Sequence, residues 1–127
     1  MGPDIFLEKF RKDDFEAHLS PEGKGRRCKR DIEKSGVGYD SIGHFRYAYK
    51  ILAILESAHC EQDGNESIVE GEFHELVPDA LKRAKDMAFR QSWDCVKISR
   101  EEFVEMLDRL LDETNFATEI VAFHSGQ

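Results

Sequence analysis

Residues 44–59 read HFRYAYKILAILESAH, and they form the strongest periodic pattern in the chain. Apolar side chains recur there every three or four positions, which is the spacing of one face of an α-helix. That face comprises Phe45, Ala48, Tyr49, Leu52, Leu55 and Ala58, widened by Ile51 and Ile54. We therefore expect a central helix here, buried among the other elements of the domain.

The residues before this helix divide into two parts. Residues 3–19, PDIFLEKFRKDDFEAHL, carry apolar side chains at steps of four, five and four, which predicts a first helix. These side chains are Phe6, Phe10, Phe15 and Leu19. Residues 20–43 contain Pro21 and five glycines, so they predict a long Gly-rich, basic loop.

The residues after the central helix predict three further helical segments and a tail. A helix restarts at residues 70–77 and must stop or kink at Pro78, because proline lacks the amide donor. Residues 79–92 and 100–114 each repeat a helical apolar spacing. The spaced residues are Leu81, Ala84 and Ala88 in the first, and Phe103, Met106, Leu107, Leu110 and Leu111 in the second. In the tail, residues 114–127, Phe116 and Ile120 lie four apart and predict a short docking helix. The fold class we expect is all-α, a small helical bundle forming a single domain over residues 1–127.

Composition limits the class of protein. Hydrophobic residues make up 40% and charged residues 35%, which is typical of a folded polar chain. The formal net charge is −8, with +2 in residues 1–50 and −10 in residues 51–127. The acidic part could bind basic partners or only keep the protein in solution. The three cysteines form no CxxC pair, and no apolar run is long enough to span a membrane. We expect a cytoplasmic protein in a reducing compartment.

An acidic turn follows the central helix. In residues 61–72, EQDGNESIVEGE, oxygen-bearing side chains fall at the first, third, fifth, seventh and twelfth positions. They are Glu61, Asp63, Asn65, Ser67 and Glu72. This run resembles the calcium-binding loop of the EF-hand superfamily, and residues 91–102 fit the same frame. Each run has an isoleucine in its eighth position and a glutamate in its twelfth, and a phenylalanine follows each run.

The resemblance covers about residues 44–113 and implies an EF-hand-like helix-loop-helix pair with an extra N-terminal helix. Glu61, Glu66 and Val69 depart from the loop pattern, so we expect no cofactor, or calcium bound only weakly. A second interpretation is a plain bundle with capped turns, because Ser67 with Glu70 and Ser99 with Glu102 match the capping box.

The same resemblance implies a non-enzymatic adaptor. EF-hand lobes of this kind grip an amphipathic helix of a partner protein, or join a larger assembly, through an apolar groove. The groove residues expected here are Phe73, Leu76, Phe103 and Leu107. No arrangement of side chains in the sequence points to catalysis.

A basic cluster supports an alternative function. Residues 24–30, KGRRCKR, concentrate positive charge that could neutralise phosphates. The anion-binding candidates are Lys24, Arg26, Arg27, Lys29 and Arg30. The alternative is thus a polyanion- or nucleic-acid-associated module. A third hypothesis is a small acidic effector or inhibitor that blocks a basic site on another protein.

Overall fold

The computed structural model describes residues 4–17, 39–45, 49–63, 73–95 and 98–126, and they form an α+β fold. The elements are β1 (Asp4–Arg11), α1 (Lys12–Ala17), β2 (Tyr39–Phe45), α3 (Tyr49–Asp63), β3 (His74–Glu75), α4 (Pro78–Arg90), α5 (Arg100–Glu113) and β4 (Glu119–Gly126). The all-α prediction is therefore wrong, and so is the helical bundle.

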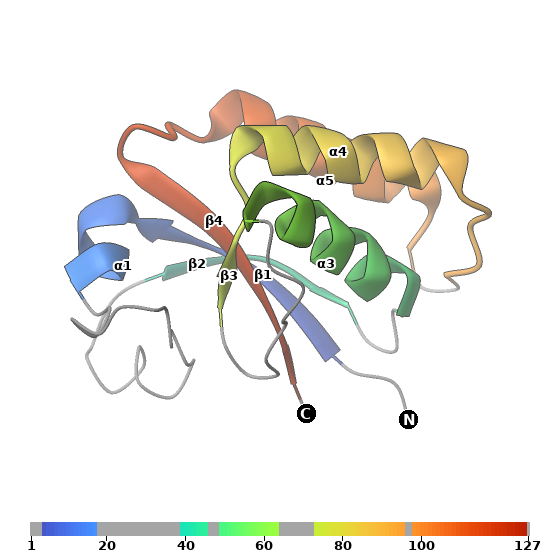
Figure 1. Ribbon diagram of the computed structural model, residues 1–127, viewed down its shortest axis with the longest axis horizontal. Helices are drawn as coiled ribbons and strands as arrows, with labels where there is room; N and C mark the ends of the chain where they lie inside the picture. Colours follow the sequence, from blue (N-terminus) through green and yellow to red (C-terminus); the bar gives the residue numbers. More distant parts are fainter. Residues whose placement is uncertain (1–3, 18–38, 46–48, 64–72, 96–97, 127) are drawn as a thin grey trace.

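The four strands make one antiparallel sheet in the order β2-β1-β4-β3. The first and last strands of the chain are neighbours along their full length, from the pair Asp4 and Gly126 to the pair Arg11 and Glu119. Helices α3, α4 and α5 cover one face of the sheet, and α1 lies beyond one end of it (Figure 1). We call α3, α4 and α5 the helical layer.

Residues 4–11 are a strand rather than the start of a helix. Ile5 and Leu7 point toward the helical layer and are fully buried in the main core. Phe10 points to the opposite face and packs with Phe15 and Phe73 in a second cluster. A step of four residues keeps two side chains on one side in both a strand and a helix, so the Phe6 to Phe10 spacing misled the prediction.

The C-terminal tail is also a strand, β4, and not a short helix. Residues 120–124 are all buried, because β4 is an inner strand of the sheet and packs on both of its faces. Val121 and Phe123 join the core beneath the helical layer, and Ile120 and Ala122 join the opposite cluster. A strand buried on both faces loses the alternation of polar and apolar residues that normally identifies it.

The helix predicted over residues 70–77 is wrong in residues 73–77, the part that the structure describes. His74 and Glu75 form β3, which pairs with Phe123 and Ala122 of β4. Pro78 then begins α4 instead of ending a helix. The first helical position tolerates proline, since its amide would have no partner inside the helix.

The helices predicted over residues 79–92 and 100–114 are confirmed. The central helix is confirmed from Tyr49 onward, whereas His44 and Phe45 of the predicted stretch belong to β2. The central helix is α3, whose buried apolar residues are Ile51, Ile54, Leu55 and Ala58. Tyr49 is 61% exposed, so the buried face is rotated from the expected one. Helices α4 and α5 bury Leu81, Ala84, Ala88, Phe103, Leu107 and Leu110. The long loop expected over residues 20–43 is wrong at its end, because Tyr39–Gly43 belong to β2, and residues 20–38 lie outside the described residues.

Candidate interaction site on the helical layer

Helices α4 and α5 lie side by side and run in opposite directions (Figure 1). Two contacts fix this arrangement. Arg100, at the start of α5, donates from Nη2 to the carbonyl of Gln91 just after α4, at 2.8 Å. Lys85 of α4 donates from Nζ to Oδ1 of Asp108 on α5, at 2.6 Å. The end of α4 and the start of α5 therefore form one end of the helical layer.

Helix α5 carries an acidic stripe on its outer side. Acidic residues follow one another at steps of four, three and four, so they line one side of the helix. The acidic stripe comprises Glu101, Glu105, Asp108 and Asp112. Asp108 is half-buried by its contact with Lys85, and the other three are exposed. The helix as a whole has six acidic and two basic residues, so its surface attracts cations.

An exposed aromatic side chain lies next to the acidic stripe. Phe89 of α4 is 59% exposed, which is unusual for a phenylalanine in a helix that buries its apolar face. It follows Lys85 by one helical turn, and Lys85 contacts the stripe at Asp108. Phe89 is therefore on the side of α4 that faces α5, near the end where α5 begins.

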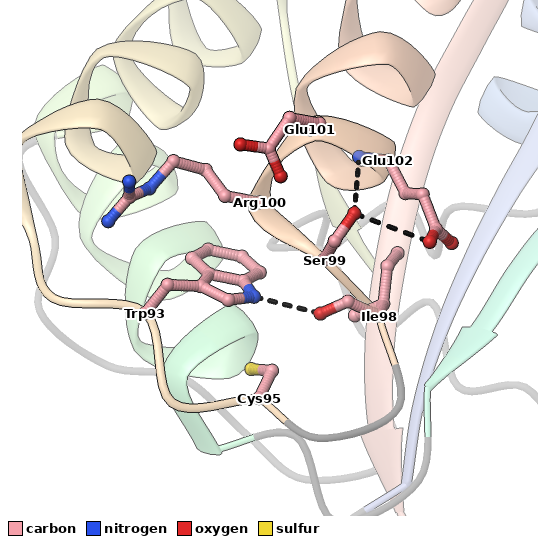
Figure 2. Close-up of a pocket in the computed structure, with 7 residues that line it drawn as sticks. All are labelled: Trp93, Cys95, Ile98, Ser99, Arg100, Glu101 and Glu102. Atoms are coloured by element: carbon pink, nitrogen blue, oxygen red, sulfur yellow. Dashed lines mark hydrogen bonds between the residues drawn. The ribbon is translucent and has the colours of Figure 1, made fainter.

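A pocket of about 420 Å³ opens at the same end of the helical layer (Figure 2). Its lining residues are Trp93, Cys95, Ile98, Ser99, Arg100, Glu101 and Glu102. The Trp93 indole is held in place, since Nε1 donates to the Ile98 carbonyl at 2.8 Å. The ring also packs on Phe103, with the ring centres 5.5 Å apart. Trp93 therefore gives the pocket a rigid aromatic wall.

Ser99 caps the first turn of α5 at the edge of the pocket (Figure 2). Its Oγ accepts the Glu102 backbone N–H at 3.1 Å and donates to Glu102 Oε1 at 3.3 Å. The N-cap predicted at Ser99 is thus confirmed. Ser67 and Glu70, the other predicted capping box, lie outside the described residues.

The pocket thiol is neutral at physiological pH. Burial and the nearby Asp94 carboxylate raise the pKa of Cys95 above the ordinary value of a thiol, although Lys50 and a backbone hydrogen bond at Ile51 oppose the shift. The nucleophilic form of cysteine is the thiolate, so this environment does not activate Cys95 for attack.

The opposite face of the sheet holds a second group of ionisable side chains. The rings of His44, Phe6 and His124 stack across β2, β1 and β4, with centres 4.3 and 4.6 Å apart. A carboxylate accompanies each histidine: Asp4 Oδ2 is 3.2 Å from His44 Nε2, and Glu8 Oε1 is 3.9 Å from His124 Nε2. Glu8 and His124 are each 2% exposed, so their pair has little access to solvent.

The predicted calcium ligands are only partly located. Helix α3 continues through Glu61 and ends at Asp63, but their side chains are outside the described part of the chain. Asn65, Ser67 and Glu72 are also outside it. The helix through Asp63 and the strand after Phe73 depart from a helix-loop-helix arrangement. Among the described residues, no group of three or more histidine, cysteine, aspartate or glutamate side chains could hold a metal ion. Calcium binding at this turn stays a prediction.

The four residues predicted to form a partner groove lie in the interior. Phe103, Leu76 and Leu107 are fully buried between the helical layer and the sheet. Phe73 is 3% exposed and packs in the cluster on the opposite face. The structure therefore does not bring the four together on one surface, because Phe73 is separated from the other three by the sheet.

The basic cluster of residues 24–30 lies outside the described residues. The cluster comprises Lys24, Arg26, Arg27, Lys29 and Arg30. Binding of nucleic acid or another polyanion by this segment stays a prediction.

Comparison with known proteins adds no family to this description. No family model matches the chain, and no curated protein or solved structure matches it. In the portion of the chain that the structure describes, no helix is long and apolar enough to cross a membrane.

Sequence reasoning missed Phe89 and did not single out the acidic stripe. The spacing of Glu101, Glu105, Asp108 and Asp112 was a readable signal, since four acidic residues at these steps must share one side of a helix. The exposure of Phe89 gave no such signal, because it depends on how α4 rotates against the sheet.

Proposed function

We propose that this protein is a non-enzymatic interaction subunit that binds a basic amphipathic helix of another protein across α4 and α5. The observation that carries the proposal is the exposed Phe89 beside the acidic stripe. A basic amphipathic helix has the matching chemistry, because its apolar side can cover Phe89 while its lysines and arginines face the stripe. This keeps the adaptor class expected from the sequence and replaces the buried groove by an exposed surface.

The dimensions of the acidic stripe suit a short helical partner. From Glu101 to Asp112 the helix rises by about 16 Å, which equals about three turns of a partner helix lying alongside. Two basic groups of α4 are already paired within the molecule, Lys85 with Asp108 and Arg90 with Asp86 at 3.4 Å. The repulsion that α4 exerts on a basic partner is reduced accordingly.

The two kinds of contact contribute differently. Complete burial of a phenylalanine side chain is worth roughly 1.5–3 kcal/mol, so Phe89 supplies affinity. Exposed charges mainly orient the partner and speed its arrival, and they are screened by salt. We therefore expect binding to weaken as salt rises, without being abolished.

A charge-reversal experiment tests the proposal. The probe is a fluorescent amphipathic peptide of lysine and leucine, titrated against the wild type, Glu105→Lys/Asp112→Lys and Phe89→Ala. Each variant is expected to weaken binding by about tenfold, because each removes one of the two kinds of contact. The peptide anisotropy gives the dissociation constants.

The control has the same net charge as the reversed stripe. In Asp13→Lys/Asp14→Lys, two carboxylates are reversed on α1, which lies outside the helical layer. If this control weakened binding as much as the stripe variant, attraction would follow net charge alone and the proposed surface would be excluded. Unfolding midpoints must show that all the variants remain folded.

A further inference from the structure

We infer that the pocket at the start of α5 receives an arginine side chain of the bound partner. This inference rests on the proposed function, because the pocket opens at the end of the helical layer where α4 carries Phe89, and its lining includes Glu101, the first residue of the acidic stripe. It adds a specific chemical class of ligand, a guanidinium group, to a surface otherwise defined by charge and apolar contact.

The aromatic wall is suited to a planar cation. The Trp93 ring is fixed by its hydrogen bond to the Ile98 carbonyl at 2.8 Å and by its contact with Phe103. A guanidinium group stacks favourably on the face of an indole, and a rigid ring loses little freedom when it is covered. A volume of about 420 Å³ is enough for the guanidinium and its stem.

The charges around the pocket favour a cation over an anion. The start of α5 carries about half a positive charge from the helix dipole, which alone would favour an anion. The carboxylates of Glu101 and Glu102 oppose this effect, because each carries a full negative charge. In the view of Figure 2, the Glu101 carboxylate and the Trp93 ring are on the same side of Ser99. The Cys95 thiol is neutral, so Glu101 and Glu102 carry the negative charge of the lining residues.

Arg100 does not reverse this balance. Its guanidinium is committed to the Gln91 carbonyl at 2.8 Å. Its Nε is buried and has no hydrogen-bond partner among the described residues, so no ligand can reach it without rearrangement. With Arg100 counted, the lining residues carry two negative charges against one positive charge.

Arginine fits better than lysine for a geometric reason. A guanidinium can stack on the Trp93 face and still donate in its own plane to a carboxylate such as Glu101. A lysine ammonium is a compact, strongly hydrated charge that must lose more water to make the same contact. The pocket should therefore distinguish two partners that have equal charge.

The test compares two peptides of equal length and charge, one of arginine and leucine and the other of lysine and leucine. The wild type should bind the arginine peptide about two- to fivefold more tightly. Trp93 is the only tryptophan in the chain, so its fluorescence emission should change with the arginine peptide more than with the lysine peptide. Trp93→Leu and Glu101→Gln should each bring the ratio of the two dissociation constants close to one.

Each outcome has a defined meaning. Equal affinities for the two peptides in the wild type, or an arginine preference that survives in both variants, would overturn the pocket inference. Glu101→Gln decides the test if Trp93→Leu fails to fold, because the Glu101 side chain is exposed. If stripe reversal weakens both peptides equally and there is no arginine preference, the docking proposal stands without the pocket. If neither peptide binds the wild type, the docking proposal itself fails.

Discussion

Phe103 and Phe89 show how two residues of one type can have opposite roles. Phe103 is fully buried beneath α5, and Phe89 is 59% exposed on α4. We predict that Phe103→Ala lowers the free energy of unfolding by about 3–5 kcal/mol, because it removes a core side chain and leaves a cavity. Phe89→Ala should change it by less than about 0.5 kcal/mol while weakening peptide binding.

Denaturant unfolding of the two variants measures this difference. The interpretation of Phe103 as a core residue, and of Phe89 as a contact residue, would be contradicted if the two losses of stability were equal. A Phe103→Ala protein as stable as the wild type would show that the core described around α5 is wrong.

A second residue, Glu56, makes the free energy of unfolding depend on pH. Burial on α3 raises the pKa of this carboxyl above its ordinary value of about 4.5. The folded state thus holds the proton more tightly than the unfolded state, so the ionised form opposes folding above the raised pKa. Glu56→Gln should be more stable than the wild type near pH 7, and the gain should disappear below about pH 4.5.

Thermal unfolding at neutral and acidic pH measures the gain. Glu113→Gln is a suitable control, because it removes an exposed carboxylate from another helix. A gain for Glu56→Gln that persists unchanged in acid would mean that the effect comes from helix propensity and not from ionisation.

At the scale of elements, strand β2 depends on Gly43 for its contact with α5. A Cβ at this position would lie 2.9 Å from Cζ of Phe45 and 3.4 Å from Sδ of Met106. The Phe45 ring has limited room to move, since it also packs edge-on against Phe103 with ring centres 6.4 Å apart. Glycine at this point keeps the ring of Phe45 folded over its own strand.

We predict that Gly43→Ala destabilises the protein by about 1 kcal/mol. Overpacking costs about 1–3 kcal/mol, and the lower entropy of the unfolded chain offsets about 0.4–1 kcal/mol of that. In a Phe45→Leu background the penalty should shrink, because the smaller side chain leaves space for the new methyl group. A double-mutant cycle measures this coupling. If Gly43→Ala cost as much stability in the Phe45→Leu background as in the wild type, the strain would not come from the contact with Phe45.

The elements also show what the sequence could and could not predict. Helices α4 and α5 were predictable, since each buries one face and leaves a polar one. Strands β1 and β4 were not, because both of their faces are buried and a spacing of four fits helix and strand alike. Helix α4 has the polar outer face that is typical of an amphipathic helix. The position of Phe89 outside the core, however, depends on how α4 packs against the sheet.

At the scale of the whole molecule, residues 4–11 and 119–126, far apart in the sequence, are brought together by the β1–β4 pair. Such a long-range pairing leaves no local signal in the sequence, which explains why the sheet was missed. The charge imbalance was visible from the start, and part of the acidic excess of residues 51–127 forms the stripe on α5. The functional hypothesis thus still has an amphipathic helix as the partner, but the proposed binding surface is now the exposed one across α4 and α5.

The central claim is that a basic helix binds across α4 and α5, and an NMR titration of isotope-labelled protein with the arginine and leucine peptide tests it most directly. The account predicts the largest backbone amide shifts in residues 85–113, with small shifts in β1, β2 and β4. The largest shifts on the sheet strands, around His44 and Phe6, with little change in α4 and α5, would contradict it.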